Sequence, residues 1–587
     1  MDMVNGEKEL NEMTLGKVCD ICGIALPERF DRTLKIGMVY AHPMRAEKDA
    51  VVFCTITSKE AEHCKEALKK DASIVLASME IKNSFFKNEE RVIGIPNVFE
   101  SIQKYERYIK SLFDLKTVTV TGSVGKTTTT EMVKAVLLEG GLRLTSNYSV
   151  NNSHGAILRT MQHIKNDTQI YLQEVGAAEI GYVEKSAKGL QPDVVIITNI
   201  GDAHLDCYGT REQILKDKAS LIDNMNCGGV AFLDLDDPML RAYKSDKTIM
   251  YYAVNDKTAD YYAENIVSKN TEQNFDIVEK SSGEKYSATI KLPGEWNIRN
   301  ALAAFAVARH FGIDAEHIIR GLGNYRPSGI RQNICNVGGY TLYLDTFNSA
   351  PNTVVDSAKA LCGMEPEEGG KRNLVIGDMA HLGKEENELH YWVGTELAKL
   401  NWDLLVCFGP RAYYIYKGVL DSGVKKNVVF FAEEERESLN NFIRSSIGRK
   451  DITLYKGCQA IDLSRTIDAV YGTSFYHNNE LISVNFEEVR YRTIGEYYRE
   501  FNKLMTPNVR KLRISDESGC VRRISPDACR EQNKLEQVVI DDGIVNIGRA
   551  AFFRCYHLES VTLGRGLQFM EASAFNSCVR LENICIP

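Results

Sequence analysis

The stretch Val118-Thr119-Val120-Thr121-Gly122-Ser123-Val124-Gly125-Lys126-Thr127-Thr128 decides our interpretation of this chain. The β-branched residues from Thr117 to Val120 predict a buried strand. Apolar residues then recur at helical spacing from Met132 to Leu137, and Gly140 predicts the end of that helix. A glycine-rich turn between a strand and a helix is typical of a phosphate-binding loop, because the backbone N–H groups of the turn and of the helix N-terminus point toward anionic oxygens.

Lys126 and Thr127 are the side chains that a nucleoside triphosphate and its metal need in such a loop. A lysine at this position reaches the outer phosphates, and the threonine hydroxyl binds Mg²⁺. The predicted nucleotide-binding residues of the loop are Gly122, Ser123, Val124, Gly125, Lys126, Thr127 and Thr128. A chance glycine-rich turn is the alternative, and the Gly-Lys-Thr sequence directly after a strand disfavours it.

The spacing of the glycines is shorter than in the general phosphate-binding loop. The general pattern G-x-x-x-x-G-K-[ST] would place its first glycine at Val120. The form T-G-x-x-G-K-T, from Thr121 to Thr127, resembles the Mur ligases, the ATP-dependent amide ligases that build the peptide of peptidoglycan. The resemblance implies an α/β fold of three domains: a small N-terminal α/β domain, a central phosphate-loop ATPase domain with a parallel sheet, and a C-terminal Rossmann-like domain.

The composition is that of an ordinary globular protein with several domains. The chain has 587 residues, of which 44% are hydrophobic and 26% charged, and this length predicts about three to four domains. A net charge of −8 disfavours nucleic acid as a partner. Residues 1–13 are polar and acidic, unlike a signal peptide, and no apolar run approaches a membrane span. Together with 15 scattered cysteines, these features predict a cytoplasmic protein with free thiols.

Alternating strand and helix patterns, followed by a repeat, divide the chain into several parts. We expect an N-terminal carrier-substrate-binding domain at 1–115, a central ATP-binding domain at 116–328, a C-terminal Rossmann-like domain at 329–473, a linker at 474–508 and a leucine-rich repeat tail at 509–587. Strands that alternate with helices in the second and third parts predict parallel sheets.

An acid and an imidazole follow two predicted strands of the central domain. Glu174 ends the strand at 170–174, and His204 follows the strand at 194–197. Because ligands bind at the carboxyl ends of parallel strands, we expect both groups near the phosphate loop. Mg²⁺ prefers oxygen ligands, which Thr127 and Glu174 supply. A single such residue is more often structural, but their convergence favours a metal site of Thr127, Glu174 and His204.

The spacing around these groups resembles the branch of the Mur ligase family that adds D-alanyl-D-alanine to a UDP-N-acetylmuramoyl tripeptide. The matching patterns are Asn-Asn-x-x-Gly at 151–155, Glu-x-Gly-Ala at 174–177 and Asn-x-x-x-Ala-His-Leu at 199–205. From this resemblance we assign Asn151 and Asn152 to substrate binding.

Lys218 matches the lysine that CO₂ carbamylates in this family. A carbamate would turn a neutral amine into an anionic oxygen ligand for a second Mg²⁺, so the resemblance adds Lys218 to the metal ligands. The residue pattern alone favours a surface lysine on an amphipathic helix, and only the motif spacing reverses this interpretation.

Further motifs imply contacts with the nucleotide. Asn297 and Asn300 fall in a segment similar to G-x-H/W-N-x-x-N, whose asparagines contact adenine in the family, and their spacing places them on one helix face. Arg331 resembles the arginine that reaches the nucleotide phosphates. Asp345 and Asn348 fall in a segment similar to D-S-Y-N-A-N-P, whose aspartate binds the ribose.

The predicted N-terminal domain departs from the family pattern. The family has an S/T-D-S-R segment that contacts the uridine diphosphate of the substrate. The comparable stretch here is Ala41-His42-Pro43-Met44-Arg45, so only the arginine remains. We assign Arg45 to substrate binding and leave the identity of the carrier open.

The tail contains a 23-residue repeat. Leu535, Leu558 and Leu581 are in register, as are Val538, Val561 and Ile584. The pattern resembles leucine-rich repeats of the surface-antigen type, which implies a short β-solenoid-like tail. Because such units bury their apolar faces only by stacking, the tail is expected to pack on the ligase, to bind a protein partner or to self-associate.

The sequence therefore predicts an ATP-dependent amide ligase that works through an acyl phosphate. Its predicted catalytic residues are Lys126, His204, Lys218 and Arg331, its cofactors are ATP, two Mg²⁺ ions and a carbamylated Lys218, and its substrates are a nucleotide-linked peptide and a dipeptide amine. One alternative is a related ligase with another substrate, such as a folate or poly-glutamate ligase. A second is a scaffold protein with a vestigial nucleotide site and functional repeats.

Overall fold

The chain divides into two compact units, which are described separately below. The first contains Met1–Val267, Asn274–Ile290 and Glu295–Tyr325, and the second contains Ser268–Gln273, Lys291–Gly294 and Arg326–Pro587. The structure is a computed structural model and describes residues 5–42, 48–55, 59–146, 152–177, 179–203, 205–327, 331–337, 340–471, 476–477, 480–481, 510–514, 523–524, 528–532, 534–542, 544, 546–548, 550–567, 569–571 and 573–586.

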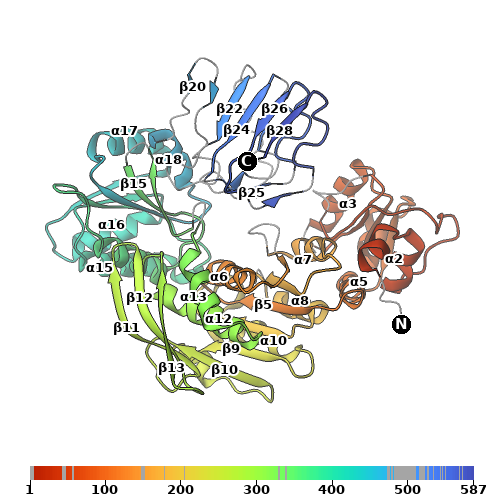
Figure 1. The fold of residues 1–587 in the computed structure, drawn as a ribbon, viewed down its shortest axis with the longest axis horizontal. Helices are drawn as coiled ribbons and strands as arrows, with labels where there is room; N and C mark the ends of the chain where they lie inside the picture. Colours follow the sequence, from red (N-terminus) through yellow and green to blue (C-terminus); the bar gives the residue numbers. More distant parts are fainter. Residues whose placement is uncertain are drawn as a thin grey trace. The chain divides into compact units, whose positions relative to one another are not determined.

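The first unit begins with a small parallel sheet in the order β1-β2-β3-β4. Figure 1 labels α2, α3 and α5 of the same domain. The elements of this domain are α1 (Gly6–Asn11), α2 (Leu15–Cys22), β1 (Val39–Tyr40), β2 (Val51–Phe53), α3 (Glu60–Lys69), β3 (Ile74–Ser78), α4 (Met79–Phe85), β4 (Val92–Ile95) and α5 (Val98–Ser111). Every residue of β2 is buried, and α5 packs against the central domain through α8.

A sheet of nine strands forms the central domain, in the order β13-β12-β11-β10-β9-β8-β5-β7-β6. The elements are β5 (Lys116–Thr121), α6 (Lys126–Glu139), β6 (Leu144–Ser146), α7 (His154–Met161), β7 (Ile170–Glu174), α8 (Tyr182–Leu190), β8 (Val194–Ile197), α9 (Leu205–Tyr208), α10 (Arg211–Asp223), β9 (Val230–Asp234), α11 (Pro238–Ala242), β10 (Thr248–Ala253), β11 (Tyr261–Lys269), β12 (Glu272–Glu279), β13 (Glu284–Ile290), α12 (Trp296–His310) and α13 (Ala315–Asn324).

The predicted strand before the phosphate loop is β5, in the middle of this sheet. It pairs in parallel with β7 on one side and β8 on the other, and all its residues after Lys116 are buried. The helix α6 packs with α12 and α13, whereas α8 packs with α10. The carboxyl ends of β5, β7 and β8 therefore lie side by side, as the sequence predicted, and place the phosphate loop at their shared edge.

In the second unit, the Rossmann-like domain has a sheet of six strands in the order β14-β15-β19-β16-β17-β18. The elements are β14 (Asn333–Val337), β15 (Tyr340–Asp345), α14 (Pro351–Cys362), β16 (Arg372–Gly377), η3 (Gly383–Glu385), α15 (Glu386–Ala398), β17 (Leu404–Phe408), α16 (Ala412–Asp421), β18 (Asn427–Phe431), η4 (Glu433–Glu435), α17 (Arg436–Ser446), β19 (Ile452–Lys456) and α18 (Leu463–Tyr471). Its strands are parallel except for β14, which is antiparallel to β15.

The tail forms two narrow sheets, in the orders β20-β21-β22-β24-β26-β28 and β23-β25-β27. The tail strands are β22 (Lys511–Ile514), β23 (Arg523–Ile524), β24 (Gln537–Ile540), β25 (Asn546–Ile547), β26 (Ser560–Thr562), β27 (Phe569–Met570) and β28 (Asn583–Cys585). The first sheet also contains β20 (Tyr476–His477) and β21 (Glu480–Leu481), which lie in the segment predicted as a linker. Val538 pairs with Val561, and Val561 with Ile584, so the 23-residue spacing is the register of this solenoid.

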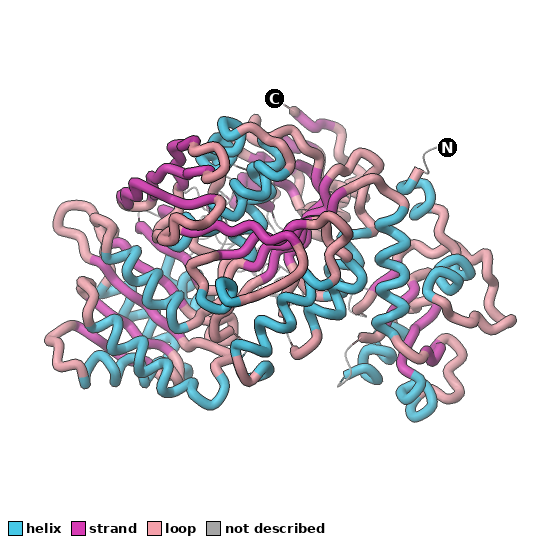
Figure 2. The backbone as a smooth tube through the Cα atoms, turned by 90° about the horizontal axis from the view of Figure 1, so that it is seen from below, coloured by secondary structure: helices cyan, strands magenta, loops and turns pink. Residues whose placement is uncertain are grey.

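The three α/β domains and the repeat tail agree with the fold class predicted from the sequence. Helices and strands alternate through the α/β domains, while the described part of the tail consists of strands, loops and turns (Figure 2). Of the helices that the structure describes, none has the length and apolar character needed to cross a membrane.

Candidate active site

The phosphate loop joins β5 to α6 through two glycines whose backbone conformation and close neighbours disfavour any side chain. Gly122 has a φ of 149° and Gly125 a φ of 85°, both in the region that favours glycine. A Cβ atom on Gly122 would lie 1.9 Å from Oγ1 of Thr198, and one on Gly125 would lie 2.8 Å from Oδ1 of Asn300. The loop conformation therefore depends on glycine at both positions.

Lys126 begins α6, and its side chain folds back over the loop. Its ammonium group donates to the carbonyl of Gly122 at 2.8 Å and to that of Ser123 at 3.2 Å. The N-terminus of α6 lies at the same end of the loop and adds the positive end of a helix dipole. Positive charge thus collects where a polyphosphate would bind.

Thr127, Glu174 and Asn152 form a line of hydrogen bonds at the carboxyl end of β7. The Thr127 hydroxyl donates to Oε2 of Glu174 at 2.8 Å, and Nδ2 of Asn152 donates to Oε1 at 2.8 Å. Glu174 is only 3% exposed and lies opposite Val120 in the pairing of β5 with β7. The structure therefore brings these three sequence-predicted residues together.

Thr127 and Glu174 have oxygen donors of the kind that Mg²⁺ prefers. Within the described part of the chain, no group of three or more His, Cys, Asp or Glu side chains is arranged to hold a metal ion. Mg²⁺ commonly takes one or two protein ligands and completes its octahedron with water and substrate phosphates. The pair therefore fits a magnesium ion that arrives with a nucleotide.

Lys218, in α10, is buried against the phosphate loop. It is 2% exposed, and its Nζ donates at 3.0 Å to the carbonyl oxygen of Gly122, which also accepts from Lys126. Burial, followed by the charge of Lys126, holds the pKa of Lys218 well below its usual value, and Asp217 partly opposes this shift. Lys218 is therefore not a surface lysine, and its low pKa favours the neutral amine, the form whose lone pair can attack CO₂.

Asn297 and Asn300 share one face of α12, as the sequence predicted, and support α6. Nδ2 of Asn300 donates to Oδ1 of Asn297 at 2.9 Å, and Oδ1 of Asn300 accepts from the Thr129 hydroxyl at 3.0 Å. Asn297 is fully buried, at 0% exposure. These contacts hold α12 against the helix that begins at the phosphate loop, and the adenine contact stays a prediction.

Sequence reasoning missed the role of Asn199, which holds the middle of the loop. Its Oδ1 accepts from the N–H of Val124 and its Nδ2 donates to the carbonyl of Val124, both at 3.0 Å. The Thr198 hydroxyl donates to the same carbonyl at 2.5 Å. Asn199 begins the Asn-x-x-x-Ala-His-Leu pattern, so the signal was present, but spacing alone does not tell which backbone its amide meets.

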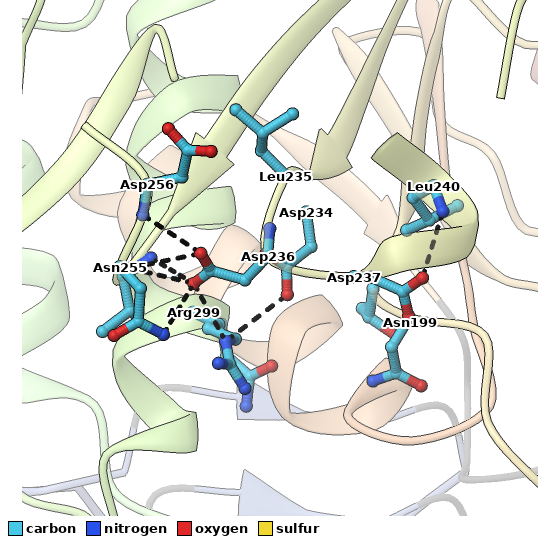
Figure 3. A network of polar contacts seen from close by, with 12 residues as sticks. Asn199, Asp234, Leu235, Asp236, Asp237, Leu240, Asn255, Asp256 and Arg299 are labelled. Atoms are coloured by element: carbon cyan, nitrogen blue, oxygen red, sulfur yellow. Dashed lines mark hydrogen bonds and ion pairs between the residues drawn. The ribbon is translucent and has the colours of Figure 1, made fainter. Parts of the chain in front are cut away.

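A second polar network surrounds the end of β9 (Figure 3). Asp237 caps α11, and its Oδ2 accepts from the N–H of Ile200, in the loop after β8, at 2.8 Å. Nε of Arg299, from α12, lies 3.5 Å from Asp234 and 3.6 Å from Asp236. Burial raises the pKa of Asp234 to about 7, and Arg299 opposes this rise. Through the end of β9, the network thus connects the loop after β8, which contains Asn199, with α12, which contains Asn300.

The second unit contains the other predicted nucleotide-binding residues. Nζ of Lys456, at the end of β19, donates to Oδ2 of Asp345 at 2.6 Å and to the backbone carbonyl of Asn348 at 3.0 Å. The guanidinium carbon of Arg331 lies 3.8 Å from the ring centre of Phe347. The motif around Asp345 did not reveal that Lys456 forms an ion pair with this predicted ribose-binding aspartate.

Arg45, Asn151 and His204 lie outside the described residues, as does most of the predicted linker at 474–508. Their assigned roles in substrate binding, metal binding and catalysis stay predictions. The site residues that the structure places at one edge of the central sheet are therefore Lys126, Thr127, Asn152, Glu174 and Lys218.

Comparison with known proteins finds similarity in two regions of the chain. Residues 120–308 match the Mur ligase middle domain, and residues 522–587 match a BspA type leucine rich repeat region with six copies. The UDP-N-acetylmuramoyl-tripeptide–D-alanyl-D-alanine ligase of Bacillus subtilis is 26% identical over 377 residues, which cover 64% of this chain and 80% of that protein.

Two solved structures have a similar fold. MurF from Acinetobacter baumannii has a TM-score of 0.67 at 21% identity and covers 78% of this chain and 99% of its own. The MurF ligase from Thermotoga maritima in complex with ADP has a TM-score of 0.62 at 22% identity, with 74% and 97% covered.

Proposed function

The chain belongs to the Mur ligase family of ATP-dependent acid–amino acid ligases, and from this premise we propose that it joins D-alanyl-D-alanine to a UDP-N-acetylmuramoyl tripeptide. The observation that carries the proposal is the cluster around the carbonyl of Gly122. Lys126 and Lys218 both donate to that oxygen, and the line of Thr127, Glu174 and Asn152 begins at the next residue of α6. Such a cluster suits phosphoryl transfer, in which catalysis consists of positioning and charge neutralisation.

The proposed reaction has two steps. An oxygen of the donor carboxylate attacks the γ-phosphorus of ATP, the bond to the β-phosphate oxygen breaks, and ADP leaves. The amine of the dipeptide then attacks the carbonyl carbon of the acyl phosphate, loses a proton, and expels inorganic phosphate as the amide forms.

The residues of the central domain divide this work between them. The backbone of the phosphate loop and Lys126 hold the phosphates and neutralise the charge that develops on them. Thr127 and Glu174 would hold a Mg²⁺ ion, which supplies charge neutralisation between the phosphates. A carbamate on Lys218 would supply oxygens for a second ion, and the buried, neutral amine is the state from which a carbamate forms.

The N-terminal domain would bind the nucleotide-linked donor. Because the segment from Ala41 to Arg45 departs from the family pattern, the donor is the part of the proposal that most needs a direct test. Relatives that act on folates or poly-glutamate share the phosphate loop, and a scaffold protein could retain a vestigial one, so the experiment must separate three outcomes.

Phosphate release from ATP, measured with a panel of donors and amines, tests the proposal. We expect turnover that requires both a UDP-N-acetylmuramoyl tripeptide and D-alanyl-D-alanine, with the amide product identified by mass spectrometry. If a product forms only with another amine, the chain is an amide ligase whose amine substrate is not D-alanyl-D-alanine. If a folded protein shows no turnover with any pair of donor and amine, a scaffold protein with a vestigial nucleotide site is favoured.

A further inference from the structure

We propose that Asp217 is a positioning residue that directs Lys218 toward the phosphate loop by capping a neighbouring helix. This role of Asp217 rests on the ligase function proposed above. Asp217 precedes Lys218 in α10 and is 4% exposed, so two consecutive charged residues of this helix are buried. Such burial is rare unless each group has partners, and the partners of Asp217 reveal its role.

The carboxylate of Asp217 caps the N-terminus of α8. Its Oδ2 accepts from the N–H of Val183 at 3.3 Å, and its Oδ1 accepts from the N–H of Glu184 at 3.2 Å. The first residues of a helix have N–H groups without intrahelical partners, and the N-cap side chain usually satisfies them. The N-cap of α8 is Gly181, which has no side chain for this purpose. The cap therefore comes from α10, and the negative charge also complements the positive end of the α8 dipole.

The same carboxylate holds a third element. The hydroxyl of Tyr208, the last residue of α9, donates to Oδ2 of Asp217 at 2.5 Å and lies 2.7 Å from the carbonyl oxygen of Glu179. Tyr208 is itself buried, at 4% exposure. Asp217 thus joins α8, α9 and α10 through three hydrogen bonds to one side chain.

The position of Asp217 in α10 makes this junction relevant to Lys218. Consecutive residues of an α-helix point about 100° apart, because 3.6 residues complete a turn. Asp217 faces α8 while Lys218 reaches the carbonyl of Gly122, so a rotation or a slide of α10 would change both contacts together. The bonds from α8 and α9 therefore fix the rotation of α10 at which the Lys218 amine meets the loop.

The capped helix is also the one that follows Glu174. The strand β7 ends at Glu174, and α8 begins at Tyr182. A carboxylate that anchors α8 to α10 therefore connects the element after the metal-binding acid with the element that carries Lys218. Loss of this anchor should displace Lys218, while the phosphate loop, which Asn199 holds, and α6, which Asn300 holds, keep their shape.

The first test measures the accessibility of the Lys218 amine and does not depend on the ligase activity. The full-length protein is treated with cyanate, which modifies amines, and the modification of Lys218 is followed by peptide mass spectrometry. We expect Lys218 to be protected in the wild type and to react about tenfold faster in Asp217→Ala, because local opening governs such protection. Asp217→Asn, which keeps one acceptor oxygen, should give an intermediate rate.

Asp314→Ala is the matched control. Asp314 caps α13 by accepting from the N–H of His317 at 3.0 Å, far along the chain from Lys218. It should lower the melting temperature and leave the reactivity of Lys218 unchanged.

If Asp217→Ala does not fold, Tyr208→Phe decides the question, because it removes one hydrogen bond and keeps the cap. Unchanged reactivity of Lys218 in a folded Asp217→Ala variant, or in Tyr208→Phe when it must replace that variant, would overturn the proposal.

The second test separates positioning from a general loss of stability. With the substrate pair established, Asp217→Ala should lower kcat about 10- to 100-fold, as removal of an outer-shell partner of a metal ligand does, with the KM for ATP nearly unchanged. A folded variant with the wild-type kcat would contradict the inference. If the wild type itself makes no amide, the proposed function fails, and the reactivity of Lys218 still decides whether Asp217 positions it.

Discussion

In the central domain, side chains of unlike chemistry from different elements meet at one sheet edge, whereas in the tail similar side chains stack on one another at a fixed interval. Lys126 from α6 and Lys218 from α10 share the carbonyl of Gly122 although 92 residues separate them in the sequence. In the tail, the rings of Phe552 and Phe575 stack at 5.0 Å with an interplanar angle of 5°, and they are 23 residues apart.

The difference shows what each pattern of sequence can specify. In a repeat, equivalent residues of successive units form a ladder and pack on one another. The stability of the repeat therefore comes from contacts between neighbouring units. The central domain has no such periodicity, and its polar residues converge because parallel strands end at one edge. Substitutions at the edge should therefore affect chemistry, and substitutions in the tail should affect stability.

Lys126→Ala should produce the largest loss of activity. Removing the ammonium group takes away charge neutralisation in the transition state, and loss of such a group typically costs about 10²- to 10³-fold in kcat. Phosphate release and amide formation measure the effect. Lys134→Ala, on the same helix α6, is the matched control and should keep wild-type turnover. Comparable turnover in Lys126→Ala and the wild type would remove the basis for the phosphate-loop assignment.

Lys218→Ala should have the next largest effect. If Lys218 acts as a carbamate, the variant removes the ligand itself and should lose about 100-fold in kcat, the upper end of the loss seen for outer-shell partners. Added formate or acetate should restore part of the activity by supplying a carboxylate oxygen. Lys216→Ala, at an exposed position of the same helix, is the control. A Lys218→Ala variant as active as the wild type in CO₂-depleted buffer would contradict the carbamate.

The fold of the central domain was predictable because its signals are local. The β-branched run before Gly122, the glycines and the apolar helix positions correspond to β5, the phosphate loop and α6. The tail was predictable for a different reason, since its 23-residue register appears directly as the pairing of Val538 with Val561. Motif spacing also placed Glu174 at the end of β7 beside the loop.

The partners of the site residues were not predictable. Asn199 and Asp345 both stood in motifs given above, but their contacts with Val124 and Lys456 depend on how distant segments pack. Asp217 precedes Lys218 in a helix predicted only as amphipathic, and only the tertiary structure shows that Asp217 caps α8. Sequence spacing identifies which residues end strands, whereas the direction of each side chain follows from helix packing that no local pattern encodes.

Removing the tail should have the smallest effect on activity. One hydrophobic cluster contains Leu463 and Ile467 of α18 together with Leu512 and Val538 of the tail, so the tail packs against the Rossmann-like domain within the second unit. A chain that ends at Tyr471 should therefore melt at a lower temperature, because it exposes part of this cluster. Its phosphate release per folded molecule should stay within about twofold of the full-length value, because the tail supplies stacking contacts and the chemistry lies in the central domain.

Val561→Asp also tests whether the tail contributes to stability and not to catalysis, without shortening the chain. Val561 is 1% exposed at the centre of the β24-β26-β28 ladder, so an aspartate there would bury a charge without a partner and open the tail. We expect an additional unfolding transition at low temperature, unchanged amide formation, and loss of any self-association or partner binding in light-scattering and pull-down measurements. If either variant lost turnover while the α/β domains stayed folded, the repeats would belong to the catalytic unit. The separation between catalysis at the central sheet edge and stability in the repeat tail would then be wrong.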